Sequence, residues 1–419
     1  MPYSNNKTPF IYLNRNLSWN FIGQFIGKAS LMLFHIVFAN LVGLQKYGEF
    51  SFVFVGGLIL FQPVLDLGLS QLITKWISRG NTDVIKSSFS IKVVVSSFLT
   101  PLVLLLGWWM NINFFLLITL IGFFLFNSLQ QSLFSILRGM EDLRPESIIS
   151  ALQNLLAFIV LFFFVLFDFK ENWIGSSILM ITRIIGTLIL SIVLWRNYYS
   201  KLKKIVRNKH FLILDTFQLW KEALSLGLVI FLIQFYFRID TIMLGLMTTE
   251  SEVGLYNMAY NFLEGTFFIP TIIMSVNFSG LSQEKNFWAY FQKGFSLLTI
   301  TGFFCCAVLF LFTELIVSSF FAPEFYNVID IIKKLSFAVP LVFWGYLTTQ
   351  SLVALDKNRI YLIITSFGLV TNVILNYIFI PKYGASGAAI TTIITETLIP
   401  LSCFIVIKQH FVKSKTNVS

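Results

Sequence analysis

The stretch LSLGLVIFLIQFYFRIDTIMLG, residues 224–245, decides the fold, because it is apolar enough to cross a lipid bilayer and still contains Arg238 and Asp240. A spanning helix needs roughly 20 mostly apolar residues. A charge at the centre of the bilayer costs about 2.5–3.5 kcal/mol, so charged side chains there face a cavity or a partner rather than lipid. The stretch therefore predicts a membrane helix with a functional polar side.

The rest of the chain has the same apolar character. Of its 419 residues, 56% are hydrophobic and only 12% are charged, about half the charged share of a typical soluble domain. A soluble protein of this size would need more polar groups to cover its surface. Its three cysteines, Cys305, Cys306 and Cys403, all lie in apolar runs and have neither disulfide nor metal-site spacing. We therefore predict an all-α membrane protein.

Hydropathy predicts twelve transmembrane helices. Their approximate ranges are 17–41, 50–73, 89–109, 112–136, 147–167, 174–195, 221–247, 255–280, 291–313, 335–355, 360–380 and 387–407.

The positions of Lys and Arg predict the orientation of these helices. Of 30 such residues, four lie within spans and five in the segments expected outside (Lys46, Lys170, Lys333, Lys334 and Lys382), which leaves 21 for the inner segments. Since inner loops carry the excess of positive charge, both termini are expected in the cytoplasm. The net charge of +10 then fits anionic headgroups of membrane lipids, and we expect no nucleic-acid partner.

Weak internal similarity divides the chain into two halves. Trp19 precedes Gly43 by 24 residues, and Trp220 precedes Gly245 by 25. Since each half holds six helices, the halves keep the same orientation and form a parallel repeat about a pseudo-two-fold axis. We predict six-helix bundles at 1–200 and 221–419, joined by a basic cytoplasmic linker at 201–220.

Polar residues recur at helical spacing within several spans, which is typical of helices that line an aqueous cavity. Arg238 continues one such stripe, whereas Asp240 lies about 200° around the helix and points toward a neighbouring helix. The other polar residues expected to line the cavity are Gln24, His35, Gln234, Asn257 and Asn261.

Three deep cations, Lys28, Arg183 and Arg238, indicate a substrate with an anionic part such as a diphosphate. Each could instead form a structural pair with an acid. Asp240, Glu264, Glu396 and Asp66 are candidates either for such pairing or for binding a coupling ion, H⁺ or Na⁺. Lys92 lies near the end of its span and is expected to extend toward the headgroups. No other cofactor and no metal site is expected.

Three segments carry a family resemblance: LVGLQKYGEFSF at 41–52, LDLGLSQLITKWISR at 65–79 and RIDTIMLGLMTTESEVGLYNMAYNFLE at 238–264. They resemble the Wzx-type polysaccharide-unit flippases of the multidrug/oligosaccharidyl-lipid/polysaccharide exporter superfamily. The resemblance implies a V of two bundles around a cationic cavity. It also implies ion-coupled alternating access that moves undecaprenyl-diphosphate-linked oligosaccharides, such as O-antigen units of lipopolysaccharide, to the outer leaflet of the bacterial inner membrane. A polysaccharide polymerase and a chain-length regulator are the implied partners.

Two other functions compete with a flippase. A drug/cation antiporter of the same fold would favour an acid-rich cavity, which the three deep cations argue against. A membrane glycan polymerase or ligase would need a large outer loop with catalytic residues. The largest outer loop, at 314–334, contains no His, and no nucleophile motif is present. We therefore expect a transporter rather than an enzyme.

Overall fold

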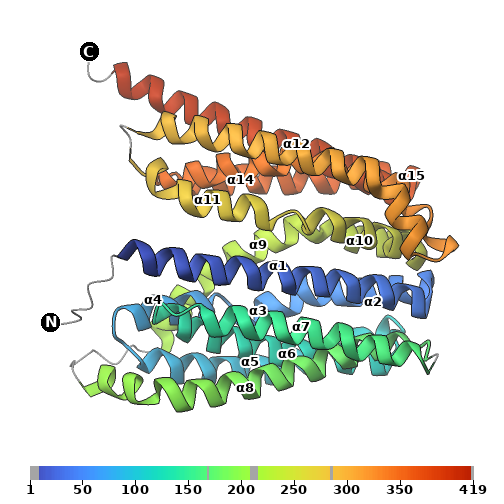
Figure 1. Cartoon of the computed structure of the whole chain (residues 1–419), viewed down its shortest axis with the longest axis horizontal. Coiled ribbons are helices and arrows are strands. Elements are labelled where there is room, and N and C mark those ends of the chain that lie inside the picture. Colours follow the sequence, from blue (N-terminus) through green and yellow to red (C-terminus); the bar gives the residue numbers. More distant parts are fainter. Residues whose placement is uncertain (1–8, 168, 208–215, 284–285, 417–419) are drawn as a thin grey trace. The chain divides into compact units, whose positions relative to one another are not determined.

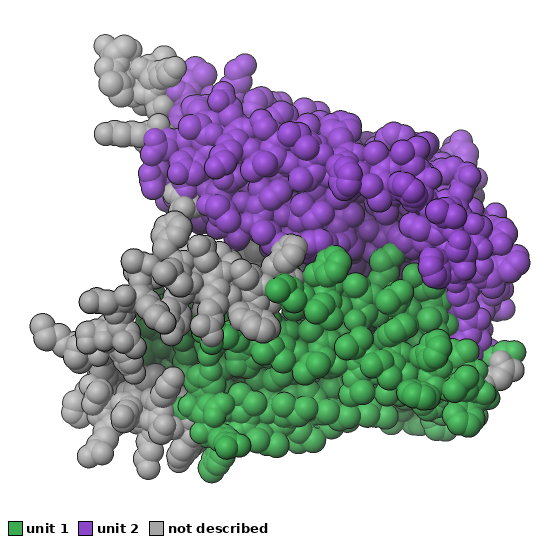
Figure 2. Space-filling view, in the orientation of Figure 1, with its two compact units in different colours: residues 1–37, 56–231 green, residues 38–55, 232–419 purple. Residues whose placement is uncertain are grey.

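The structure is a computed structural model that describes residues 9–167, 169–207, 216–283 and 286–416, and these residues form helices and short connections without a β-strand. Their contacts define two compact units (Figures 1 and 2). Unit 1 comprises residues 1–37 and 56–231, and unit 2 comprises residues 38–55 and 232–419. The expected all-α membrane fold class is confirmed by this architecture and by the structural relatives given below.

The two units do not coincide with the two halves of the sequence. The chain passes from one unit to the other inside α1 (Pro9–Val42) and again inside α9 (Thr216–Met247), and α2 (Leu44–Gly56) lies almost wholly in unit 2. A long helix can do this because its two ends pack against different neighbours. The expected bundles at 1–200 and 221–419 stay a prediction, and the centre of the expected linker, 208–215, lies outside the described residues.

Unit 1 is built around α6 (Phe114–Gly139), which packs against α8 (Asn172–Arg207) and α4 (Leu69–Ser78). Its other helices are η1 (Gly57–Phe61, a π-helix), α3 (Gln62–Asp66), α5 (Asp83–Trp109) and α7 (Arg144–Val165). Its buried core joins α4, α5, α6 and α8 and includes Leu69, Leu72, Ile73, Ile91, Phe134, Leu137 and Leu190.

The second predicted span is broken between α3 and α4. Leu67 and Gly68 have left-handed backbones, with φ of 45° and 75°. For Leu67 this conformation is strained. A side chain at Gly227 of α9 would come within 2.7 Å of the Leu67 carbonyl carbon. Glycine at position 227 therefore lets α9 lie directly against the break.

Unit 2 contains α10 (Glu250–Glu264), α11 (Phe268–Leu281), α12 (Phe287–Phe320), η2 (Pro323–Phe325), α13 (Val328–Ser336), α14 (Ala338–Ala354) and α15 (Asn358–Thr416). Helix α14 packs against α15, α12 and α11 through buried side chains that include Val339, Phe343 and Leu347. Helix α15 turns sharply at Gly384, where φ is 54° and ψ is −133°. Glycine adopts this conformation at little cost, which a residue with a Cβ does not.

Within the described residues, nine helical segments are long and apolar enough to cross a membrane. The expected twelve spans differ from this number for visible reasons. The eighth is interrupted between α10 and α11, the tenth (α14) is short, and the eleventh and twelfth run together across the turn at Gly384. Twelve spans therefore stay a prediction.

Many large apolar side chains point outward from the long helices. Phe98 is 78% exposed, Trp108 77%, and Trp195 and Leu311 71% each. Exposure on this scale is unfavourable in water but neutral in lipid. Together with the spans, it identifies a multi-pass membrane protein.

Candidate functional site

Asp240 lies at the centre of a polar cluster inside unit 2 and is only 2% exposed. Its carboxylate accepts hydrogen bonds from Tyr256 Oη at 2.7 Å, Asn376 Nδ2 at 2.5 Å and Thr392 Oγ1 at 3.2 Å. Asn372 extends the cluster through Asn376, at 2.7 Å. These groups come from α9, α10 and the two arms of α15, so the Asp240 cluster joins three helices at one carboxylate.

The Asp240 cluster contains no cation among the described residues, and the Oδ1 atom of Asn376 is buried without a hydrogen-bond partner. A buried carboxylate normally needs a cation, a bound metal ion or a proton to offset its charge. The carboxylate, amide and hydroxyl oxygens gathered here are ligands for a hard cation, and the carboxylate alone can take a proton. The cluster therefore has the chemistry of an H⁺ or Na⁺ site.

Arg238 occupies the other side of α9 and is paired. It forms an ion pair with Glu264 at the end of α10, and its guanidinium lies 4.8 Å from the centre of the Tyr260 ring. Arg238 is only 9% exposed. Since the carboxylate offsets its charge, Arg238 takes the pairing alternative in this structure, with Glu264 rather than Asp240 or Glu396 as the partner.

Glu396 is a second buried acid of unit 2. It accepts a hydrogen bond from Tyr236 Oη at 2.8 Å and is 7% exposed, with no cation partner among the described residues. Asn257 accepts from Thr241 at 3.2 Å and joins α10 to α9, whereas Asn261 donates to Tyr47 Oη at 3.2 Å and joins α10 to α2.

Arg183 is a membrane cation of unit 1 whose described partners are neutral groups. Its guanidinium donates to Gln130 Oε1 and to Asn154 Oδ1, both at 3.3 Å, and lies 5.4 Å from the centre of the Phe123 ring. The amide of Gln130 also donates to Gln153 at 2.9 Å. Among the residues that the structure describes, no acid pairs with Arg183, so its charge is available to an anion.

A glycine one turn along α8 helps to form this Arg183 site. A Cβ at position 186 would lie 2.3 Å from Gln153 Oε1 and 2.7 Å from Gln130 Nε2. Gly186 therefore lets the two glutamines lie against α8, beside the guanidinium. Sequence patterns did not single out Gln130, Gln153 or Asn154, because single amides in apolar runs are common and their partners lie on other helices.

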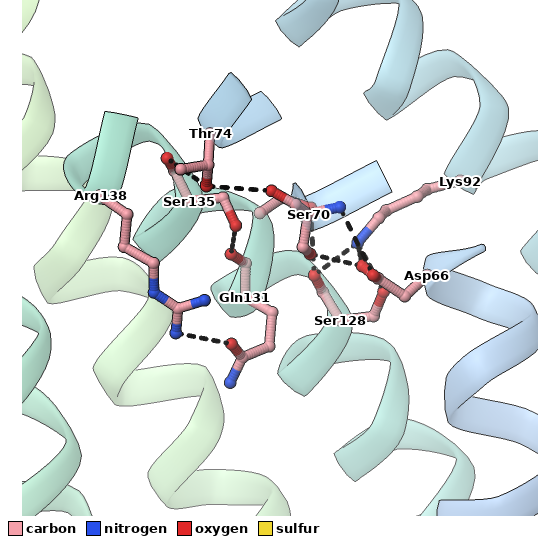
Figure 3. A network of polar contacts seen from close by, with 9 residues as sticks. Asp66, Ser70, Thr74, Lys92, Ser128, Gln131, Ser135 and Arg138 are labelled. Atoms are coloured by element: carbon pink, nitrogen blue, oxygen red, sulfur yellow. Dashed lines mark hydrogen bonds and ion pairs between the residues drawn. The ribbon is translucent and has the colours of Figure 1, made fainter. Parts of the chain in front are cut away.

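Asp66 ends α3 at the break in unit 1 and pairs with Lys92 of α5 (Figure 3). Lys92 Nζ lies 2.8 Å from Asp66 Oδ1 and 2.9 Å from both the carbonyl oxygen and the Oγ of Ser128. Ser70 Oγ also donates to Asp66, at 2.5 Å. Lys92 is 4% exposed, so the expectation that it extends toward the headgroups was wrong: an acid and α6 hold it inside the unit.

The network continues from this pair along α4 and α6 (Figure 3). Thr74 Oγ1 donates to the carbonyl oxygens of Ser70 and Ser135, at 3.1 and 3.2 Å. Further along α6, Arg138 pairs with Glu146 of α7, with Nε 2.8 Å from Oε2. The break between α3 and α4 is thus fixed by side chains from α4, α5 and α6.

Replacing Lys92 with Met should destabilise unit 1, because Asp66 would keep a charge in a buried site. Removing one partner of a buried ion pair costs about 3–5 kcal/mol, whereas replacing both can be nearly neutral. We expect Lys92→Met to lower the melting temperature of the purified protein, and Asp66→Asn with Lys92→Met to restore most of it.

The matched control for this prediction is Lys75→Met. Lys75 lies 3.2 Å from Glu222, and these side chains are 42% and 33% exposed, so loss of this pair costs at most about 1 kcal/mol. Equal melting temperatures for Lys92→Met and Lys75→Met would contradict the prediction.

The remaining predicted residues are placed as follows. Lys28 of α1 is exposed in unit 1, Gln24 is half-buried and His35 is buried, while Gln234 of α9 is exposed in unit 2. Their expected role as cavity residues stays a prediction.

Comparison with known proteins supports the same fold and family. Residues 13–283 match a family model described as polysaccharide biosynthesis protein, and residues 226–378 match the MatE model. The capsular polysaccharide biosynthesis protein CapF of Staphylococcus aureus is 22% identical over 95% of this chain and 100% of its own length. An uncharacterised membrane protein of Methanocaldococcus jannaschii is 23% identical over 90% of this chain and 80% of its own.

Two solved structures are similar in fold. An inward-facing multidrug resistance MATE family transporter of the MOP superfamily has a TM-score of 0.73 and 16% identity, with 94% of this chain and 96% of its own covered. The lipid II flippase MurJ, in an inward closed conformation, has a TM-score of 0.72 and 17% identity, and the match covers 93% of this chain and 87% of MurJ. The resemblance to polysaccharide exporters of this superfamily is thereby confirmed, and the chain belongs to the polysaccharide biosynthesis protein family, with the fold of the MOP-superfamily transporters.

Proposed function

We propose that this protein moves undecaprenyl-diphosphate-linked oligosaccharide units from the cytoplasmic to the outer leaflet of a bacterial cell membrane. The observation that carries the proposal is Arg183, a membrane cation whose described partners are neutral amides and an aromatic ring. A guanidinium held in this way can donate two parallel hydrogen bonds to a phosphate oxygen pair. A diphosphate would supply the negatively charged partner that the Arg183 guanidinium does not have among the described residues.

Arg238 and Lys28 are secondary candidates for the same anion. Arg238 can take part only when it leaves Glu264, so its pair would act as a switch between substrate-bound and empty states. Such an exchange of partners would link diphosphate binding to a rearrangement of α9 and α10, which alternating access requires.

The Asp240 cluster supports coupling to H⁺ or Na⁺. Asp240 and Glu396 are buried acids without described cation partners, and both lie in membrane helices of unit 2. Charged groups at such depth are typical of ion pathways in transporters. We assign ion coupling to Asp240 first, because three neighbouring side chains already converge on its carboxylate.

The relatives support this function without fixing the substrate. One is described as a capsular polysaccharide biosynthesis protein and another as a lipid II flippase. A drug/cation antiporter is the second candidate, favoured by the buried acids Asp240 and Glu396 and by the likeness to a MATE transporter. Arg183 argues against it, because a cationic drug would be repelled there. A glycan polymerase and a chain-length regulator are the proposed partners, and both termini are proposed to be cytoplasmic.

Deletion of the gene tests the proposal directly. Cells without the protein should retain lipid-linked oligosaccharide on the inner leaflet and lose surface glycan, and expression of the wild type should restore both. The measurement is the accessibility of the lipid-linked sugar to an external probe in intact cells, together with surface glycan yield. If deletion leaves both unchanged but sensitises the cells to cationic drugs, the antiporter replaces the flippase.

A further inference from the structure

A polar groove of about 500 Å³ opens in unit 2, where α10 begins, the 326–333 segment passes and α15 turns at Gly384. Its polar lining residues are Glu252, Tyr326, Asn327, Asp330, Lys333, Tyr383 and Ser386. These segments belong to connections that the Lys/Arg distribution assigns to the outer side of the membrane. No residue of the Asp240 cluster lines the groove.

The frame of the groove is fixed by buried contacts. The Ala385 amide donates to Glu252 Oε2 at 2.6 Å, and a Cβ at Gly384 would lie 2.3 Å from the same oxygen. Phe325 and Val328 are fully buried and anchor the 326–333 segment. A site whose shape already exists loses little conformational entropy when it binds a ligand.

Asp330 and Lys333 of the groove are paired with neighbouring charges, whereas the carboxylate of Glu252 accepts a backbone amide and has no cation partner among the described residues. Asp330 forms an ion pair with Lys334 and accepts from Ser386 at 3.0 Å. Burial raises the pKa of Asp330, but the hydrogen bonds from Lys334 and Ser386 and the charges of Lys334 and Lys333 outweigh burial and hold the pKa below its usual value. Lys333 pairs with Glu314 at 2.5 Å. Among the described residues the groove therefore offers no free cation to an anionic ligand, and its one acid without a cation partner, Glu252, is already held by the backbone.

Two tyrosines and an asparagine remain for a ligand. Tyr326 is 43% exposed and Tyr383 57%. Within the described part of the chain, neither phenol has a hydrogen-bond partner, and nor does the side chain of Asn327. The Tyr383 ring lies 6.2 Å from the Phe379 ring, centre to centre, and is otherwise open. Aromatic rings offer broad faces to C–H groups, and their hydroxyls donate and accept. Charges already held by protein groups, free amide and phenol groups and exposed rings together suit a neutral ligand rich in hydroxyl groups.

We propose that this groove binds the saccharide part of the translocated molecule, on the side where that saccharide is released. This inference rests on the proposed function for the identity of the sugar. It assigns the diphosphate to Arg183 of unit 1 and the saccharide to the groove of unit 2.

The test is a binding measurement on the purified full chain in detergent. The probe is the water-soluble oligosaccharide released by mild acid from the lipid-linked intermediate of the same cells, and saturation-transfer NMR detects its binding. We expect Tyr326→Ala with Tyr383→Ala to weaken binding about tenfold, because two ring faces are lost. Tyr377→Ala is the matched control, since Tyr377 is 70% exposed on the same helix but outside the groove.

Several outcomes would overturn the proposal: no binding by the wild type, equal binding by the double variant, or displacement of the oligosaccharide by inorganic diphosphate. A double variant that binds normally but lowers polymer yield would assign the groove to a protein partner instead, which also overturns it. Failure of the proposed function is recognised separately, because the deletion experiment tests translocation in cells, whereas this measurement tests only binding to the purified protein.

Discussion

Replacing Arg183 with Met should slow translocation strongly without lowering the melting temperature. Arg183→Met loses two hydrogen bonds to neutral amides, but it also removes a membrane-buried charge without an acid partner, and the two effects on stability offset each other. Hydrogen bonds to a charged group are worth about 1.5–3 kcal/mol, which corresponds to a transport rate about 10- to 100-fold lower if they are made to the diphosphate. The measurement is translocation of a fluorescent lipid-linked oligosaccharide in proteoliposomes.

Two variants sharpen this result. Arg183→Lys keeps the charge but loses the planar pair of donors, so its rate should lie between those of the wild type and Arg183→Met. Arg196→Met removes an exposed arginine from the same helix and should leave transport unchanged. A melting temperature that falls in step with the rate for Arg183→Met would show a structural role and contradict the prediction.

The contrast between Arg183 and Arg238 shows which features of the site could be predicted from the sequence. Both are single cations in apolar runs, and hydropathy predicted that each needs a partner or a cavity. Which of the two is neutralised depends on the neighbouring helix: α10 supplies Glu264 to Arg238, whereas α6 and α7 supply two amides and an aromatic ring to Arg183. A pattern along one helix cannot contain this information.

The same limit explains Lys92 and the breaks in the helices. Lys92 lies near the end of its span, a position from which long side chains usually reach the headgroups. Its acid partner, Asp66, lies 26 residues away on a segment that stops at left-handed Leu67. Hydropathy, which sums the apolar residues along the chain, predicted the all-α membrane fold. It cannot predict the break at Leu67, because Leu contributes the same hydropathy in a helical and in a left-handed backbone. The turn at Gly384, in contrast, falls in the connection between the predicted spans 360–380 and 387–407.

Replacing Asp240 with Asn should abolish the dependence of transport on an ion gradient. Asn keeps the shape of Asp240, and its oxygen can still accept from Tyr256 and Thr392, while its NH2 group can donate to Asn376 if that amide turns to present Oδ1. It can neither take up a proton nor offset the charge of Na⁺. In proteoliposomes, the wild type should respond to an imposed H⁺ or Na⁺ gradient, and Asp240→Asn should transport at one low rate with or without it. Asp356→Asn is the control, since Asp356 is an exposed acid of the same unit that lies outside the spans and outside the groove.

Thermal stability then identifies the ion. A ligand that binds only the folded state stabilises it by RT ln(1 + [L]/Kd), about 2.7 kcal/mol at 100 times Kd. If the ion is Na⁺, NaCl should raise the melting temperature of the wild type above its value in the same concentration of KCl, and Asp240→Asn should lose this difference. If the ion is H⁺, the two salts should act alike, and lowering the pH should stabilise the wild type but not Asp240→Asn. An Asp240→Asn protein that keeps the full response to a gradient would exclude Asp240 from coupling. Glu396 would then be the acid to test, because it is the other buried carboxylate of unit 2 that has no cation among its described partners.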